Sequence, residues 1–406
     1  MRLLALVCAL ALAAAHADAA AAARWLGSWG ASPAPPMAAP PGGDPRRATS
    51  SFNNQTVVQI VRLSAGGQRL RLRLTNEYGP HALDIGAARV ALVGPDGGVL
   101  PGSDRPVTFS GARTATIPAG APLISDPVAL PTAALARLRV SLFFPSDTGG
   151  CTCHMAGQEL VQVSPPGDFT ERPLPTPAGP AQYRAFLSGV EVETAAPAGP
   201  VVVAFGDSIT DGYQSSLGTN HRWPDRLAER LTARYPGRAA AVVNAGIGGN
   251  RVLSDGVIAI FGQSALTRFD RDVLSVPGAT HVIVLEGVND LGSSRTTPPS
   301  AAALISGYRQ LIARAHAHGL KVIGATILPY GGAGYFGAPG EAVRQQVNGW
   351  IRTGREFDGV TDLDAAIRDP ARPERMRADL QSGDWLHPND AGYRVMGEAI
   401  DLSLLR

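Results

Sequence analysis

The chain has 406 residues, 45% of them hydrophobic, and a formal net charge of +2 at pH 7. This length exceeds that of a typical single domain, so we expect two domains, and the apolar content is sufficient for a core in each. The small net charge, with no dense cluster of lysine and arginine, excludes the electrostatic footprint of a nucleic-acid-binding protein.

The first residues have the pattern of a secretory signal peptide. A basic start at Arg2 precedes a short apolar run, and small residues at positions 15–19 offer cleavage sites. The apolar run is too short to span a bilayer, and no later stretch is long enough. We therefore predict a signal peptide at residues 1–19, a secreted or periplasmic protein and no stable membrane insertion, with the cleavage position left open.

Residues 25–194 carry the alternating pattern of antiparallel strands. Residues 68–75 alternate arginine and leucine strictly, so that the leucines would face a core. Residues 136–143 alternate nearly as well, and further strands are predicted at 56–63, 82–93, 106–110 and 183–192. Short strands at regular spacing, separated by Gly, Pro, Asn and Asp, predict an all-β sandwich with a jelly-roll-like topology.

Two cysteines, Cys151 and Cys153, remain once the signal peptide is removed. An exported protein permits a disulfide, but a Cys-x-Cys bridge closes a very small ring. Two free thiols or a weak metal site are equally compatible with this spacing, so the pairing is left open.

A segment rich in proline and alanine, residues 195–200, predicts a linker between the sandwich and a second domain at residues 201–406. In that second domain, predicted strands alternate with helical stripes. The strands lie at 201–206, 240–246, 281–285, 321–328 and 359–363, and the stripes at 223–235, 304–315 and 395–404. Strict alternation of strand and helix predicts a parallel five-stranded sheet with helices on both faces.

Polar residues follow the first three of these strands. Ser208 comes directly after the first strand, Gly248-Gly249 after the second, and Asn289 after the third. The carboxyl edge of such a sheet is where open α/β folds bind ligands. Acyl transfer needs a nucleophilic hydroxyl, a base with a carboxylate partner, and N–H donors for the oxyanion. His387, three residues after Asp384, supplies a candidate base and carboxylate on one short turn.

These four blocks, in this order, resemble the SGNH (GDSL) hydrolase family of esterases over residues 200–406. The resemblance implies that Ser208 is the nucleophile, His387 the base and Asp384 its acidic partner. It also implies an oxyanion hole formed by Ser208, Gly249 and Asn289, with Gly248 as the alternative to Gly249. The resemblance further implies a flavodoxin-like strand order, with the first three strands adjacent, in a three-layer α/β/α domain.

The predicted function is therefore an exported serine esterase that forms an acyl-enzyme and needs no metal or organic cofactor. Similar proteins include arylesterases and carbohydrate acetylesterases, so the expected partner is a small-molecule or polysaccharide ester. The sandwich favours carbohydrate by fold analogy alone. The alternatives are a lipase-like acylhydrolase, an acyltransferase, and a carbohydrate-binding protein with a degenerate hydrolase domain. The oligomeric state is not predicted.

Some assignments concern residues outside the four blocks. The run from Arg268 to Asp272 is predicted to be a solvated helix face with local ion pairs. His316 and His318 are predicted to lie on the surface of a helix. The sandwich either binds carbohydrate or serves as a structural domain that covers or extends the active-site cleft. In either case, a protein beginning near Ala198 is predicted to retain the chemistry on a small soluble ester.

Overall fold

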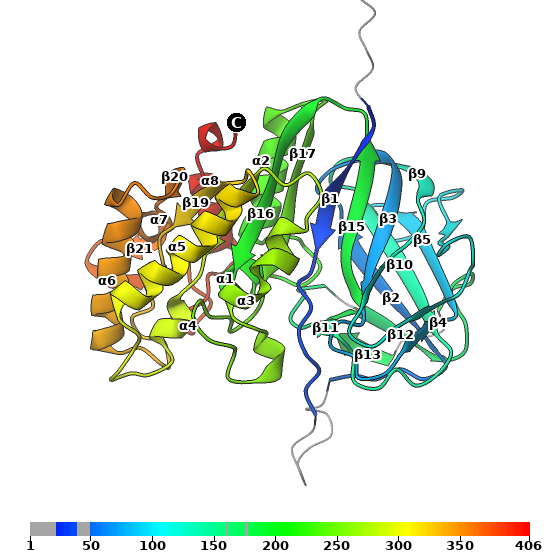
Figure 1. Ribbon diagram of the computed structural model, residues 1–406, viewed down its shortest axis with the longest axis horizontal. Helices are drawn as coiled ribbons and strands as arrows, with labels where there is room; N and C mark the ends of the chain where they lie inside the picture. The colour runs from blue at the N-terminus through cyan, green and yellow to red at the C-terminus, as the bar shows by residue number, and fades with distance from the viewer. Residues whose placement is uncertain (1–21, 39–48, 160, 175–177) are drawn as a thin grey trace, which may run out of the picture.

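The computed structural model describes residues 22–38, 49–159, 161–174 and 178–406, which form a β-rich half and an α/β half side by side (Figure 1). Each half has a hydrophobic core of its own. The predicted signal peptide, residues 1–19, lies outside the described residues.

Two antiparallel sheets make up the N-terminal half. The first contains β1 (Arg24–Gly30), β15 (Leu187–Thr194), β3 (Gly67–Thr75), β8 (Pro122–Ile124) and β9 (Val128–Thr132). The second contains β13 (Ala178–Ala181), β12 (Val161–Pro166), β2 (Gln55–Arg62), β10 (Arg137–Phe144), β5 (Ala87–Val93) and β6 (Arg105–Pro106). One core joins the inner faces of both sheets, and the alternating leucines of β3 are fully buried in it, as their spacing predicts.

Two short ladders complete this half: β4 (Leu83–Ile85) pairs with β7 (Ala115–Ile117), and β11 (Cys153–His154) pairs with β14 (Arg184–Ala185). The strand predicted at 82–93 is broken at Gly86, where a Cβ atom would lie 2.7 Å from the ring of Phe143. The strand predicted at 183–192 is likewise divided, because Phe186 has a positive φ of 53°. A disulfide joins Cys151 and Cys153 across a Cα–Cα distance of 5.2 Å.

The C-terminal half is built on one parallel sheet. It contains β16 (Ala198–Gly206), β17 (Ala239–Gly246), β18 (His281–Leu285), β19 (Lys321–Ala325) and β20 (Gly359–Thr361) in the order β17-β16-β18-β19-β20. The first three strands of this sheet are thus adjacent, which confirms the predicted flavodoxin-like α/β fold. A small hairpin, β21 (Arg368–Asp369) with β22 (Arg372–Met376), lies outside this sheet.

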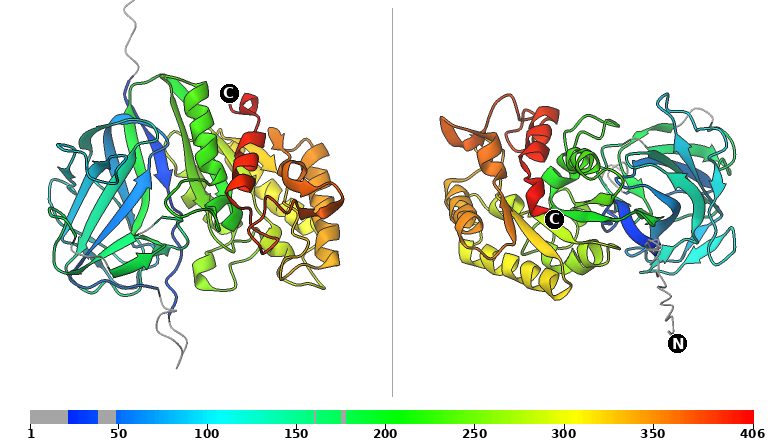
Figure 2. Two further views of the ribbon diagram at one scale, coloured as in Figure 1. Left: turned by 180° about the vertical axis from the view of Figure 1, so that it is seen from behind. Right: turned by 90° about the horizontal axis from the view of Figure 1, so that it is seen from above.

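Helices cover both faces of the parallel sheet (Figure 2). They are α1 (Ser208–Asp211), α2 (Trp223–Arg234), α3 (Ala265–Phe269), α4 (Val288–Leu291), α5 (Ala301–Ala317), α6 (Ala338–Thr353), α7 (Leu363–Ile367) and α8 (Asp390–Ala399). α2 packs against α8, whereas α5 packs against α3 and α6. The predicted stripe of α2 is confirmed, since Trp223, Leu227 and Leu231 are all buried.

The two halves meet along β1 and β17, which lie side by side (Figure 1). The amide of Gly27 donates to Pro277 O over 2.9 Å, and the amide of Val242 donates to Ser64 Oγ over 3.0 Å. β16 already begins at Ala198, so the second half of the predicted linker 195–200 is a strand of the parallel sheet. The division into two domains near this point otherwise stays a prediction.

Candidate active site

Three side chains at the carboxyl edge of the parallel sheet form one hydrogen-bonded chain. Ser208 begins α1 directly after β16, and Asp207 caps this helix by accepting from the amide of Ile209. The Ser208 hydroxyl lies 2.8 Å from Nε2 of His387, whose Nδ1 lies 2.6 Å from Oδ2 of Asp384. The structure therefore brings together the predicted nucleophile, base and acidic partner.

The turn before α8 places Asp384 against the imidazole. Oδ1 of Asp384 accepts from the amides of Leu386 and His387, each over 2.9 Å, which leaves Oδ2 for the ring. Partial burial alone would raise the pKa of Asp384, but the hydrogen bonds from the His387 ring and from these amides outweigh it and hold the pKa well below its usual range. Asp384 is thus an ionised acceptor that fixes the His387 tautomer with Nδ1 protonated. Asn389 caps α8 by accepting from the amide of Gly392.

Backbone amides gather beside the Ser208 hydroxyl. Within the described residues, no acceptor is bonded to the amides of Ser208, Gly248 or Gly249. Gly249 has a φ of +74°, and a Cβ atom there would lie 2.4 Å from the ring of Phe261. A Cβ atom at Gly248 would meet only Ser208 Cβ, at 4.0 Å. Glycine is therefore required at position 249, where the backbone turns closely past Phe261.

The side-chain amide of Asn289 completes this group of donors. Asn289 lies in α4 after β18, and its Nδ2 donates to Asn250 O over 3.0 Å. The hydroxyl of Tyr335 donates to Asn289 Oδ1 over 3.2 Å, so the orientation of the amide is set from both ends. Because an amide nitrogen carries two protons, a second N–H remains for a substrate oxygen. Nothing in the sequence marks Tyr335 as a partner of Asn289.

A cavity of about 520 Å³ opens over these groups. Its lining consists of Met155, Ala156, Gln182, Tyr183, Ser208, Tyr213, Gly248, Gly249, Ile260, Phe261, Asn289, Tyr335, Leu386 and His387. None of these residues is Asp, Glu, Lys or Arg, and most are apolar or aromatic. Four of them, Met155, Ala156, Gln182 and Tyr183, belong to the sandwich. The sandwich therefore extends the wall of the cavity, which is one of the two roles expected for it, and the activity of a protein beginning near Ala198 on a small ester stays a prediction.

A buried arginine, Arg268, donates hydrogen bonds to the strand ends that carry the site. Arg268 is 1% exposed and donates to Ala245 O over 2.7 Å and to Gly206 O over 2.8 Å, at the ends of two strands. Its Nε donates to Asn250 Oδ1 over 2.8 Å, and its guanidinium also pairs with Asp272 and Glu286. The prediction of a solvated helix face here is wrong. Arg268, Phe269 and Asp272 are all buried in this run, and of the prediction only the local ion pairs are present.

Buried carboxyl groups surround this arginine. Burial raises the pKa of Asp207 to about 7 against the opposing hydrogen bond from the Ile209 amide, and it raises the pKa of Asp290 to about 6. Burial also raises the pKa of Glu286 well above its usual range, and the charge of Asp207 raises it further. Asp290 accepts from the amides of Val252 and Leu253 and so braces the loop after Asn250.

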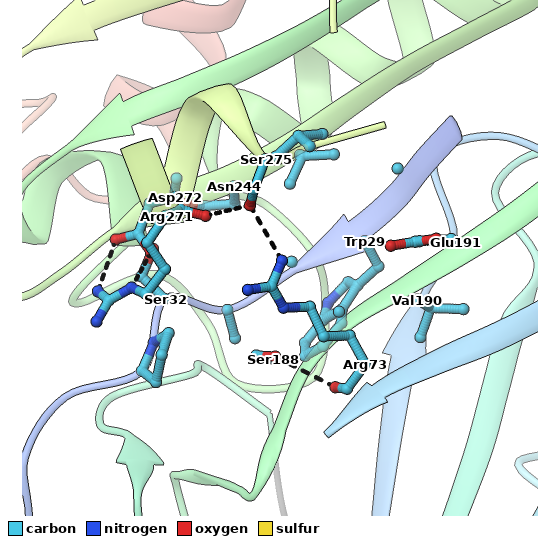
Figure 3. Close-up of a pocket in the computed structure, with 18 of the residues that line it drawn as sticks. Trp29, Ser32, Arg73, Ser188, Val190, Glu191, Asn244, Arg271, Asp272 and Ser275 are labelled. Atoms are coloured by element: carbon cyan, nitrogen blue, oxygen red, sulfur yellow. Dashed lines mark hydrogen bonds and ion pairs between the residues drawn. The ribbon is translucent and has the colours of Figure 1, made fainter. Parts of the chain in front are cut away.

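A second, smaller cavity lies between the two halves (Figure 3). Arg73 points into it and donates to Ser275 Oγ over 3.0 Å, while Arg271 pairs with Asp272. Its volume of about 60 Å³ is that of a few water molecules, so it is too small for an ester substrate.

Several expectations concern groups away from the triad. His316 is exposed and pairs with Asp358, and His318 is exposed as well, as predicted. Among the described residues, no three His, Cys, Asp or Glu side chains are grouped so that they could hold a metal ion. Within the same ranges, no helix is both long and apolar enough to cross a membrane.

Comparison with known proteins agrees with this geometry. Residues 204–395 match the family model described as GDSL-like Lipase/Acylhydrolase family. The hydrolase half belongs to this family, which confirms the resemblance inferred from the four blocks. The protein is accordingly a carboxylic ester hydrolase. No match was found among curated proteins.

Solved structures of similar proteins cover about half of the chain. A carbohydrate acetylesterase family member from Sinorhizobium meliloti is 18% identical, with a TM-score of 0.42, over 51% of this chain and 99% of its own. An acetyl xylan esterase from Geobacillus stearothermophilus is 21% identical, with a TM-score of 0.39, over 52% and 96%. The lipase/acylhydrolase from Enterococcus faecalis is 21% identical, with a TM-score of 0.38, over 49% and 92%.

Proposed function

We propose that the protein is a serine esterase in which Ser208, His387 and Asp384 carry out acyl transfer. The single observation that carries the proposal is the continuous chain from Ser208 Oγ to His387 Nε2 at 2.8 Å, and from His387 Nδ1 to Asp384 Oδ2 at 2.6 Å. These are the hydrogen bonds that a nucleophile, a general base and an orienting carboxylate require.

In the first half of the reaction, Ser208 Oγ attacks the ester carbonyl as His387 Nε2 takes the hydroxyl proton. Negative charge then develops on the carbonyl oxygen, facing the amides of Ser208 and Gly249 and the Nδ2 group of Asn289. The C–O bond to the alcohol breaks, and His387 returns the proton to the leaving oxygen. Water then attacks the acyl-enzyme, with His387 as base again, which releases the carboxylic acid and restores the Ser208 hydroxyl.

The lining of the cavity supports a small aryl or acyl ester as the substrate. Apart from the reacting groups, Gln182 is the one side chain of the lining that carries an amide, and no side chain there is a carboxylate, an ammonium or a guanidinium. Beyond the reacting groups, Gln182 and the tyrosine hydroxyls, a polar sugar would find no side-chain partners in such a pocket, and each unpaired hydroxyl group would cost free energy. Apolar groups of an ester, in contrast, gain by leaving water.

Deacetylation of carbohydrate is the second candidate, because four aromatic rings line the cavity and could stack on a sugar face. The rings belong to Tyr183, Tyr213, Phe261 and Tyr335. A panel of acetylated sugars and p-nitrophenyl esters separates the two candidates. We expect a higher kcat/KM for the p-nitrophenyl esters, and a clear preference for the acetylated sugars would favour the second candidate.

We also propose that the protein is exported. The basic and apolar pattern of residues 1–19 supports export, as does the disulfide between Cys151 and Cys153, since disulfides persist in oxidising compartments. Fractionation of the producing cells tests this: the mature protein should be found outside the cytoplasm, with its N-terminus shortened. Full-length protein in the cytoplasm would contradict export without touching the catalytic proposal.

Labelling with a fluorophosphonate tests the catalytic proposal. The reagent should add to one residue, and mass spectrometry of the peptides should place it on Ser208. Ser208→Ala should prevent labelling, whereas Ser306→Ala, which changes an exposed serine of α5, should not. Labelling at another residue, or none in an enzyme that still hydrolyses esters, would overturn the proposal.

A further inference from the structure

The four sandwich residues of the active-site cavity all adjoin one short ladder, β11 with β14. In this ladder Cys153 pairs with Ala185 and His154 pairs with Arg184. The chain leaves His154 directly into Met155 and Ala156, and it enters Arg184 directly from Gln182 and Tyr183. The position of the ladder therefore determines the position of this wall of the cavity. Figure 1 shows β11 at the side of the sandwich that faces the hydrolase half.

His154 ties the ladder to the helical turn that carries Ser208. Its Nε2 lies 2.9 Å from Oδ1 of Asp211, and its Nδ1 lies 3.0 Å from the carbonyl oxygen of Ser32. Asp211 is the last residue of α1, whose first residue is Ser208. His154 is 6% exposed and Asp211 is 1% exposed, so this contact is buried between the two halves. A buried hydrogen-bonded contact of this kind holds its partners in one arrangement.

Further contacts hold the ladder in place from the sandwich side. The amide of Ala34 donates to Cys153 O over 2.9 Å, and the disulfide between Cys151 and Cys153 closes the chain just before His154. Tyr183 packs its ring against Phe52, with ring centroids 6.2 Å apart. The wall is thus a preformed part of the pocket, with Tyr183 as its rigid portion.

We propose that the sandwich is the specificity element of this esterase: Met155 and Tyr183 contact the apolar group of the ester, and His154 is a positioning residue that keeps them over Ser208. This inference rests on the proposed esterase function and extends it to the choice of substrate. Met155 is half-buried, and its flexible thioether adapts to groups of different shape, whereas Tyr183 offers a fixed aromatic face. The substrate class that suits this wall is a neutral ester with an aryl group or an acyl chain of several carbons.

Changing the size of residue 155 tests the contact. Met155→Trp narrows the cavity and Met155→Ala widens it, while Leu100→Trp makes a similar change at an exposed position that does not line the cavity. Two ratios of kcat/KM are measured for each variant: p-nitrophenyl hexanoate to p-nitrophenyl acetate, which lengthens the acyl group, and naphthyl acetate to p-nitrophenyl acetate, which enlarges the alcohol.

We expect Met155→Trp to lower at least one ratio by about tenfold, which is the discrimination that an apolar pocket gives for a group of this size. Met155→Ala should raise the same ratio, and Leu100→Trp should leave both unchanged. Fluorophosphonate labelling of Ser208 is measured in every variant. If labelling persists and neither Met155 variant changes either ratio by more than about twofold, the specificity inference is overturned and the esterase proposal stands. Loss of labelling at Ser208 in the unmodified protein would instead overturn the esterase proposal.

The role of His154 is tested through its partner. Asp211→Asn keeps a side-chain oxygen that accepts from His154 Nε2, whereas Asp211→Ala removes it. We expect Asp211→Ala to raise KM for the preferred larger ester by about tenfold or more, with a smaller change for p-nitrophenyl acetate, and Asp211→Asn to restore most of the lost discrimination. If the two variants discriminate equally between the larger ester and p-nitrophenyl acetate, His154 does not position the wall. If Asp211→Ala fails to fold, His154→Ala removes the same contact from the other side, and an unchanged ratio in that variant would overturn the positioning role.

Discussion

Both sides of the active-site cavity supply apolar and aromatic side chains, but the reacting groups come from one side alone. The hydrolase side supplies every group that acts on protons or negative charge, from loops that follow three neighbouring strands and from the turn before α8. The sandwich side supplies a methionine, an alanine, a glutamine and a tyrosine that adjoin a two-stranded ladder. If the sandwich selects the substrate as proposed, substitutions on the two sides should have different kinetic effects.

The largest expected effect comes from the nucleophile. Ser208→Ala should lower kcat by at least about 10⁴, because removal of the attacking group leaves only the oxyanion donors. Binding of an apolar ester analogue should persist, since the sandwich wall is untouched. Hydrolysis kinetics and equilibrium binding measure the two effects separately. Near-normal turnover in a folded variant would contradict the role of Ser208 as the nucleophile.

The buried arginine should matter mainly for stability. Arg268→Met leaves Glu286 buried without its cation, while Asp272 keeps its other arginine partner, and the cost should be about 3–5 kcal/mol in the free energy of unfolding. Denaturant titration measures this value. The control is Arg309→Met, which removes an exposed ion pair with Glu356 and should change stability little. The ratio of hexanoate to acetate hydrolysis should stay the same in any folded Arg268 variant, and a changed ratio would show that selection also depends on the hydrolase side.

Loss of one oxyanion donor should reduce turnover without changing the preference between substrates. Asn289→Ala should lower kcat by about 10²–10³, the usual effect of removing such a donor. KM and the substrate ratios should change little, because Asn289 acts on the developing charge. A change confined to KM would mean that Asn289 binds the ground state instead. Tyr335→Phe, which removes only the hydrogen bond to Asn289 Oδ1, should have the same kind of effect at a smaller size.

The smallest expected effect is on the stability of the folded protein at low pH. It tests which half of the protein limits that stability. Burial, together with the charge of the nearby Lys321, lowers the pKa of His281 in β18 to about 4. The unfolded histidine titrates near 6.5, so the unfolded chain binds a proton that the folded chain does not. His281 should therefore lower stability by on the order of 1–3 kcal/mol as pH drops from about 6.5 to about 4, whereas Asp207 and Asp290, with raised pKa values of about 7 and about 6, act in the opposite direction.

Thermal unfolding across this pH range measures the effect. Compared with the unmodified protein, His281→Leu should gain stability as pH drops through this range, whereas His318→Asn, at an exposed position, should keep the unmodified pH dependence. An unmodified pH dependence in His281→Leu would show that groups elsewhere, including those of the sandwich, set the stability at low pH.

The features that the sequence predicts well are local ones. A run of apolar residues followed by Asp207-Ser208, or by Gly248-Gly249, carries both the strand and the functional loop within a few residues. The same holds for Asp384 and His387, which share one turn. Because parallel strands end at one edge of the sheet, correct prediction of the strands and their order is enough to bring these blocks together.

The features that the sequence does not predict depend on contacts between distant segments. Met155 and Tyr183 line the cavity only because the sandwich packs against the hydrolase half, and no periodicity marks them. Arg268 has the same charge and spacing as a surface residue, and only the strand ends packed around it explain its burial. The linker at 195–200 fails for a related reason, since Ala198 gains a place in the sheet beside Ala239 that its composition does not suggest.

The structure of the enzyme after reaction with a phosphonate ester that carries a hexyl or aryl substituent tests this division of tasks most directly. We predict a bond between phosphorus and Ser208 Oγ, the phosphoryl oxygen within hydrogen-bond reach of the Gly249 amide and Asn289 Nδ2, and the substituent packed against Met155 and Tyr183. A bond to another residue, or a substituent directed away from the sandwich, would contradict the account.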